Sequence, residues 1–138
     1  MLGQLTDGII LVALTVAIHS LSLGWSLRQI DRRLREVREL PAGPTILLLS
    51  RLAILVIFAH LIEILLWGIY YDWSGVFDGM ELSFYFSAVT YATIGYGDIV
   101  PPVEWRILAS IEGLTGILMC AWSGGFFFAV VSRIHRLD

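Results

Sequence analysis

The sequence predicts an all-α membrane protein that crosses the bilayer three times and has one short re-entrant helix. Of its 138 residues, 57% are hydrophobic and 15% are charged, whereas an ordinary soluble domain has about 25% charged residues. The charges are clustered, and the apolar stretches between them are long enough to cross about 30 Å of hydrocarbon. A single cysteine, Cys120, excludes an internal disulfide framework, and the net charge of −3 gives no indication of nucleic-acid binding.

The first apolar stretch, residues 8–27, has no formal charge and about the length of a membrane helix. A cleaved signal peptide is the alternative interpretation. It would need basic residues before the apolar stretch and small residues at a cleavage site after it. Here MLGQLTD has no Lys or Arg, and the stretch ends in SLRQIDRR. We therefore expect residues 1–43 to form an extra N-terminal membrane helix followed by a basic, amphipathic cytoplasmic linker.

The second and third stretches each contain one deeply placed carboxylate. The second span is expected over residues 44–71, with Pro44 in its first turn and Glu63 inside it. The third is expected over residues 105–133 and contains Glu112. At helical rise, both carboxylates lie about 10–12 Å below the same surface, where an unpaired carboxylate is costly. We expect them to hydrogen-bond polar groups of the intervening helix, or each other; the alternative is that each snorkels or is protonated.

Between these spans, ELSFYFSAVTYA (residues 81–92) is too short to cross the membrane and leads into TIGYGDIVPP. Glycine enters left-handed backbone regions freely, so alternating glycines allow successive carbonyls to point the same way. Four such segments around an axis would form rings of carbonyl oxygen that replace the hydration shell of an alkali ion. The Thr93 hydroxyl would supply the innermost ring. The preceding helix directs its partly negative C-terminal end at the axis, which favours a cation.

TYATIGYGD resembles the selectivity-filter signature of the potassium channel pore-domain family. The resemblance covers residues 44–138 and divides them into an outer helix (44–71), a pore helix with an extended filter (80–98) and an inner helix (105–133). It implies a homotetramer in the lipid bilayer, because one chain supplies a quarter of each carbonyl ring. The implied activity is passive, selective conduction of K⁺ as the permeant ion, with no enzymatic function.

The same resemblance assigns roles to individual residues. The K⁺-coordinating filter is formed by the carbonyls of Thr93, Ile94, Gly95 and Tyr96, with Gly97 shaping the outer mouth. Asp98 and Phe86 are expected to support the filter, together with Glu63 and Glu112 behind it. The Tyr96 side chain is expected to pack against Phe84 and Phe86. Val89 stands where some family members have a carboxylate that pairs with the aspartate after the filter. Gly116 matches the flexible glycine of the inner helix and is expected to be a gating hinge, although close packing between helices is the alternative.

Arginines predict the orientation of the chain. By the positive-inside rule, the basic linker and the C-terminus are cytoplasmic, and the glycine-rich segment and the N-terminus lie outside a bacterial-type cell membrane. The arginines that carry this argument are Arg28, Arg32, Arg33, Arg35, Arg38, Arg133 and Arg136. A voltage sensor is the alternative interpretation of the linker, but the interleaved acids favour an amphipathic surface helix.

Two functional alternatives stay open from the sequence: a less selective cation channel, and a non-conducting regulatory subunit. An intramembrane metallohydrolase is not favoured, because its HEXXH pattern needs two histidines one turn apart. The segment HLIE supplies only His60 beside Glu63, and His19 stands alone in its span. His19 is therefore expected to be a packed, hydrogen-bonded residue.

Overall fold

The computed structural model describes residues 2–36 and 42–135, and every regular element within them is a helix. In chain order these are α1 (Leu2–Glu36), α2 (Ala42–Trp73), α3 (Met80–Tyr91), the 3-10 helix η1 (Val103–Trp105) and α4 (Arg106–His135). Three segments are long and apolar enough to cross a membrane, namely Gly3–Arg32, Gly43–Trp73 and Val103–Ile134. The predicted all-α class with three long apolar helices is confirmed for these residues.

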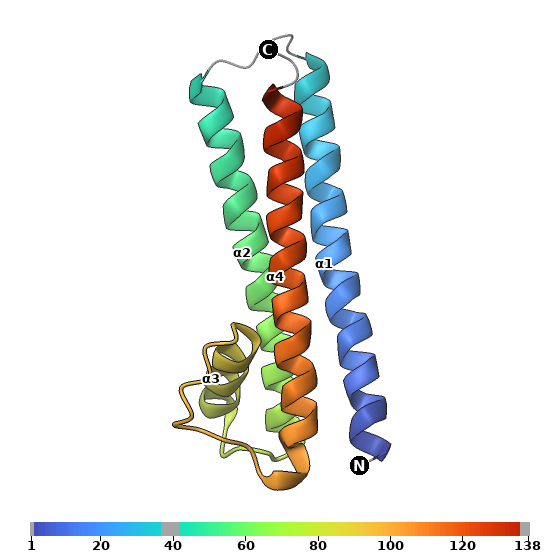
Figure 1. Ribbon diagram of the computed structural model, residues 1–138, viewed down its shortest axis with the longest axis vertical. Helices are drawn as coiled ribbons and strands as arrows, with labels where there is room; N and C mark the ends of the chain where they lie inside the picture. The colour runs from blue at the N-terminus through green and yellow to red at the C-terminus, as the bar shows by residue number, and fades with distance from the viewer. Residues whose placement is uncertain (1, 37–41, 136–138) are drawn as a thin grey trace.

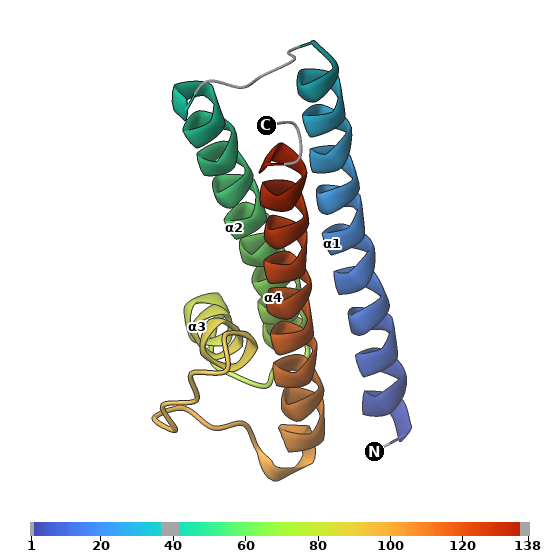
Figure 2. The same ribbon diagram turned by 45° about the horizontal axis from the view of Figure 1, so that its top comes forward.

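The three long helices run side by side, and α3 lies against α2 and α4 near one end of the bundle (Figures 1 and 2). Helix α1 packs along both α2 and α4. The start of α1 lies at the same end as α3, whereas the start of α2 and the end of α4 lie at the opposite end (Figure 1). The glycine-rich segment after α3 is therefore at the same end of the molecule as the start of α1.

Helix α1 is longer than the apolar stretch that predicts it. It continues through the first arginines to Glu36 instead of giving way to a separate surface helix. Ile30, which lies just after the first of these arginines, is 1% exposed and packs inside the bundle. The neighbouring Asp31 forms a 2.6 Å ion pair with Arg133 of α4. The contacts of Ile30 and Asp31 with other helices therefore favour the continuation of α1 to Glu36. Residues 37–41, which include Arg38 of the predicted linker, lie outside the described residues.

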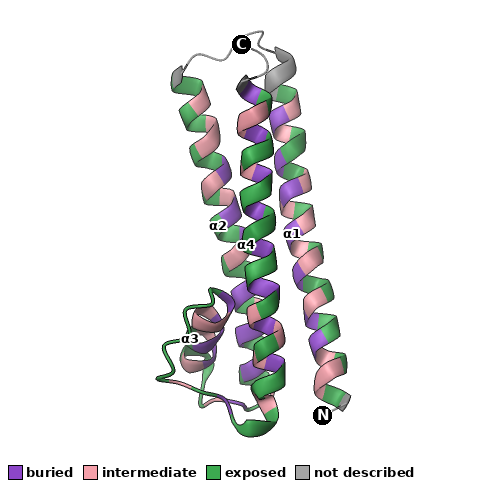
Figure 3. Ribbon diagram, in the orientation of Figure 1, coloured by how far each residue is buried: buried purple, intermediate pink, exposed green. Residues whose placement is uncertain are grey.

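Two apolar clusters hold the helices together. The first surrounds α3 and contains residues of α1, α2, α3 and α4, such as Leu11, Trp67, Phe86 and Leu108. The second lies toward the other end and joins α1, α2 and α4. Buried positions face the neighbouring helices, and exposed positions cover the outer faces (Figure 3).

Those outer faces are themselves apolar. On α2 they include Phe58, which is 60% exposed, and on α4 they include Leu114 and Phe128, which are 61% and 74% exposed. A helix that is hydrophobic on all sides belongs in a membrane or in the interior of a larger assembly. The chain is a multi-pass membrane protein by this criterion.

Candidate functional site

The segment after α3 leaves the helix at once and then alternates in backbone handedness. The Thr93 N–H donates to the Thr90 carbonyl at 3.0 Å, and the Ile94 N–H donates to the Val89 carbonyl at 2.9 Å. Thr93, Gly95 and Gly97 have φ values of 58°, 59° and 76°, all in the left-handed region. This region is unfavourable for a β-branched residue such as threonine. Left-handed residues at every second position allow successive carbonyl groups to point toward the same side of the backbone.

Residues 92–98 are all exposed in the single chain. Ile94 is 53% exposed and Tyr96 is 69% exposed, although both side chains are large and carry apolar groups. The segment lies between two candidate spans in the sequence, and Gly95 and Gly97 line a pocket together with residues of α3 and α4. Non-helical backbone at membrane depth is tolerated only where protein or water surrounds it.

Asp98 follows this segment and is held by α3. The Tyr85 hydroxyl donates to Asp98 Oδ2 at 2.6 Å, and the Ile99 N–H donates to Asp98 Oδ1 at 3.0 Å. The bond from Tyr85 lowers the pKa of the Asp98 carboxyl and raises the pKa of the tyrosine. Tyr85 stands one helical turn before Val89, the position where a carboxylate partner for Asp98 is absent. A hydroxyl from the same helix takes that place.

Glu112 is fully buried behind α3 and is held from two other helices. The Tyr71 hydroxyl of α2 donates to Glu112 Oε2 at 2.8 Å, and the Ser87 hydroxyl oxygen of α3 lies 2.5 Å from Glu112 Oε1. The Ser87 oxygen also lies 2.8 Å from the Ile64 carbonyl oxygen. The expected bond from Glu112 to a polar group of α3 is thus present, and it links α4, α3 and α2.

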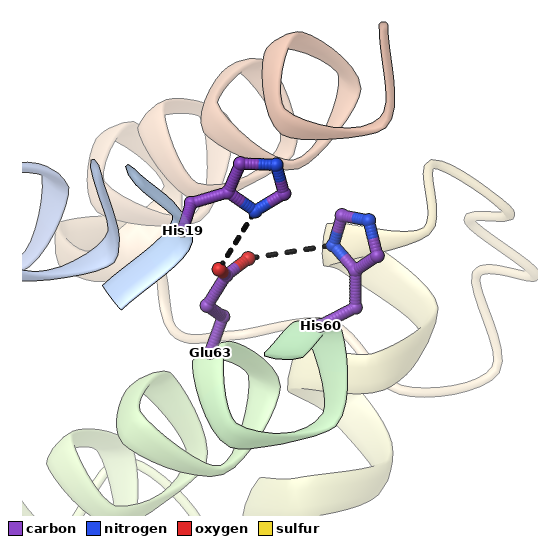
Figure 4. Close-up of side chains that lie close together, drawn as sticks. All are labelled: His19, His60 and Glu63. Carbon is purple, nitrogen blue, oxygen red and sulfur yellow. Dashed lines mark hydrogen bonds and ion pairs between the residues drawn. The ribbon is translucent and has the colours of Figure 1, made fainter. Parts of the chain in front are cut away.

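Glu63 is also fully buried and lies where α1, α2 and α3 meet (Figure 4). Its Oε1 is 2.9 Å from His19 Nδ1 of α1, and its Oε2 is 3.4 Å from His60 Nδ1, one turn earlier on α2. The hydroxyl of Tyr91, the last residue of α3, donates to the same Oε2. Glu63 and Glu112 therefore have separate partners in the described residues and are not hydrogen-bonded to each other.

Gly116 and Phe86 are placed by packing. A Cβ built on Gly116 would overlap the backbone carbonyl of Tyr91, so α4 approaches the end of α3 too closely for any side chain. This favours the packing interpretation of Gly116, while the hinge stays a prediction. Phe86 is buried against Tyr71 and Phe77, with ring centroids 5.3 Å and 4.7 Å away. Among the ring contacts of the described residues, Tyr96 has none with Phe84 or Phe86, so the predicted packing stays a prediction for an assembly.

A protein-family model described as "Ion channel" matches residues 52–133, which include α2 from Leu52 onward, α3, the glycine-rich segment and most of α4. The chain belongs to this ion-channel family. Its domain is of the potassium-channel type with two membrane helices, so the resemblance of TYATIGYGD to that family is confirmed. Neither the curated proteins nor the solved structures compared with the chain gave a match. Helix α1 lies outside the matched residues of the channel.

Sequence reasoning did not identify several residues that hold this region of the channel together. Tyr71 and Ser123 have no local motif, and His19 was expected only to pack. Tyr85 was expected among the polar groups that bond Glu63 or Glu112, but its partner is Asp98. Their partners lie on other helices or, for Tyr85, in the segment after α3, between 13 and 104 residues away in the sequence. The one usable signal was polarity: a buried carboxylate in an apolar helix needs donors at its own depth. That argument points to α3, but α1 carries no independent sign that it contributes His19.

Proposed function

We propose that this ion channel is selective for K⁺ and that its glycine-rich segment is the selectivity filter. The left-handed backbone at Thr93, Gly95 and Gly97 carries the proposal. Carbonyls turned to one side can replace the hydration shell of K⁺ ring by ring. The coordinating carbonyls are those of Thr93, Ile94, Gly95 and Tyr96, with Gly97 shaping the outer mouth.

The channel works as a homotetramer in this proposal. One chain supplies only one quarter of each carbonyl ring, so conduction needs several copies around an axis. Exposure of residues 92–98 supports this, because an irregular segment beside membrane helices needs protein or water around it. Helix α3 is then the re-entrant pore helix, α2 the outer helix and α4 the inner helix.

Local charge favours a cation over an anion. Helix α3 ends at Tyr91, directly before the segment, and its last turn contains no basic residue. The partly negative C-terminal end of a helix attracts cations within about one turn. Asp98, whose pKa is lowered by the hydrogen bond from Tyr85, adds a negative charge at the outer end of the segment.

Flux from purified protein in liposomes tests the proposal. Liposomes loaded with K⁺ should show a flux that Ba²⁺ blocks and that Na⁺ does not replace. Gly95→Ala should abolish it, because a Cβ at a left-handed position costs about 1–2 kcal/mol in every subunit. Gly24→Ala in α1 is the matched control, since a Cβ there meets nothing within 4 Å and Gly24 has no positive φ.

The other outcomes identify the alternatives. Equal K⁺ and Na⁺ fluxes would contradict potassium selectivity and indicate a less selective cation channel. A protein that assembles as a tetramer but passes neither ion would indicate a non-conducting regulatory subunit.

A further inference from the structure

His19, His60 and Glu63 form a compact polar cluster outside the ion path proposed above. Each imidazole ring directs one nitrogen toward the carboxylate, His19 from α1 and His60 from α2 (Figure 4). Glu63 and His19 are fully buried, whereas the His60 side chain is 17% exposed. The candidate ligand atoms of the three residues all lie within 4.8 Å of one another.

The cluster has too few hydrogens if both histidines are neutral. The Ser123 hydroxyl lies 3.2 Å from His19 Nε2 and 3.1 Å from His60 Nε2, while both Nδ1 atoms face Glu63. A neutral imidazole has one N–H, and a serine hydroxyl has one hydrogen. If both Nδ1 atoms donate to Glu63, Ser123 can donate to only one of the two Nε2 atoms.

The other tautomer of His60 leaves the same deficit. With its hydrogen on Nε2, the lone pair of Nδ1 faces the Glu63 carboxylate. The Tyr91 hydroxyl is the nearest other donor to that nitrogen, at 3.3 Å, but it already donates to Glu63 Oε2. One nitrogen lone pair beside a buried carboxylate is therefore left without a hydrogen. Either a further proton on that nitrogen or a bound metal ion would satisfy both groups.

We propose that His19, His60 and Glu63 bind a divalent transition metal ion, with Zn²⁺ the best match to their chemistry. Two histidines and one carboxylate are a common ligand set for zinc with an open fourth position. At about 2.0 Å from a tetrahedral zinc ion, neighbouring ligand atoms lie about 3.3 Å apart. His19 Nδ1 lies 2.9 Å from Glu63 Oε1 and His60 Nδ1 lies 3.4 Å from Glu63 Oε2, so each nitrogen is near that distance from one oxygen of the carboxylate.

The site connects α1 to the end of the pore helix. Tyr91 shares Glu63 Oε2 with His60, so a metal ion at Glu63 competes with the tyrosine for that oxygen. Tyr91 ends α3 immediately before the filter segment. Metal binding therefore changes the hydrogen bond that holds Tyr91, and with it the packing behind the filter. This consequence rests on the proposed function, whereas the metal site itself does not.

Metal binding by the full-length, tag-free protein tests the site without reference to conduction. Protein stripped with a chelator should bind one Co²⁺ per chain with the visible absorption of a four-coordinate ion, and Zn²⁺ should displace it. His19→Gln, His60→Gln and Glu63→Gln should each weaken binding by about tenfold or more. His135→Gln, which replaces the third histidine of the chain at the end of α4, should leave binding unchanged.

The His60 variant guards against misfolding, because that side chain is the least buried of the three, at 17% exposed. Without metal, the melting temperature of His60→Gln should match that of the wild type. Zn²⁺ should raise the melting temperatures of the wild type and of His135→Gln, but not that of His60→Gln. The site is excluded if the stripped wild type binds no Co²⁺ or Zn²⁺. It is equally excluded if His60→Gln binds as tightly as His135→Gln. Neither metal binding nor thermal melting depends on potassium flux. A failure of the potassium-channel proposal would therefore leave the test of the metal site valid.

Discussion

Glu112 illustrates how a single carboxylate can be kept in an apolar helix. A charged or unpaired carboxylate at membrane depth costs about 2.5–3.5 kcal/mol on insertion scales. Glu112 lies between Tyr71 and Ser87, whose hydroxyls are 2.8 Å and 2.5 Å from its oxygens. Because Ser87 has one hydroxyl hydrogen and also faces the Ile64 carbonyl at 2.8 Å, a protonated carboxyl that donates to Ser87 satisfies every contact.

Substitutions at Glu112 should therefore depend on hydrogen bonding more than on charge. Glu112→Gln keeps both an acceptor and a donor and should change stability little. Glu112→Leu leaves the Tyr71 hydroxyl without an acceptor, and each buried group left unpaired costs about 1–3 kcal/mol. Thermal melting of the purified protein should fall for the leucine variant only. Equal melting of the leucine variant and the wild type would contradict a structural role for Glu112.

The contact between Tyr85 and Asp98 makes a pH-dependent prediction outside the membrane spans. The bond lowers the pKa of Asp98, so the contact is present above the ordinary aspartate range and is lost as the pH falls through the lowered pKa. Tyr85→Phe removes the donor, and the pKa of Asp98 should rise toward about 3.9. The carboxyl carbon shift of Asp98, assigned with Asp98→Asn, measures this in an NMR titration. An unchanged midpoint in Tyr85→Phe would exclude the bond as the cause.

For individual residues, the sequence predicted the backbone of the glycine-rich segment but not which side chains pair across helices. TIGYGD predicts the glycine-rich segment because only glycine enters left-handed backbone freely, and Gly95 and Gly97 are indeed left-handed. The pairing of His19 with Glu63, which are 44 residues apart, depends on the relative register of α1 and α2 along their common axis. No local pattern encodes that register, so the cluster becomes visible only when the helices are packed.

Among the helices, close backbone approach fixes the position of α3. Gly116 of α4 touches the last turn of α3 at the Tyr91 carbonyl. Gly68 of α2 faces the same helix, where an added Cβ would lie 3.1 Å from the Phe84 Cα atom. Small residues at such contacts let membrane helices pack backbone to backbone. The short helix is thus clamped on both sides by glycines of its longer neighbours.

Gly116→Ala should separate α4 from the end of α3. The added methyl group overlaps a backbone carbonyl that cannot rotate away, and overpacking of this kind costs about 1–3 kcal/mol. The melting temperature should fall, and K⁺ flux should change because Tyr91 precedes the filter. Gly124→Ala in the same helix is the control, since a Cβ there meets nothing within 4 Å of its own chain.

The comparison between the two glycines separates packing from bending. A hinge needs conformational freedom, which alanine reduces at either position in a helix, whereas only Gly116 has a backbone neighbour in the way. Equal effects of the two substitutions would therefore contradict the packing role.

Helix ends were harder to predict than helix existence. Apolar length identifies three spans because hydrocarbon thickness sets a minimum of about 20 residues. The backbone, however, continues a helix past charged residues whenever packing favours it, and α1 runs on to Glu36 with Ile30 buried. Charge marks where a helix leaves the membrane, which differs from where the helix ends.

In the whole molecule, basic and acidic residues are distributed unequally between the two ends of the long axis. The start of α1, α3 and the glycine-rich segment lie at one end, and the end of α1 and the end of α4 lie at the other (Figure 1). Arg28 and Arg32 are exposed toward the second end, and Arg133 pairs there with Asp31. Asp78, Glu81 and Asp98 lie at the first end. Arginine-rich ends of membrane proteins are retained in the cytoplasm.

This polarity predicts that the start of the chain and the filter segment face outward together, with the C-terminal end inside. A small epitope tag at Met1 should react with a membrane-impermeant label in intact cells, and a tag at Asp138 should react only after permeabilisation. The three spans require the two termini to lie on opposite sides, so the pair of tags serves as its own control. A protected Met1 tag with a labelled Asp138 tag would reverse the orientation. Labelling of both tags in intact cells would instead contradict three crossings, because an odd number of spans cannot leave both ends on one side.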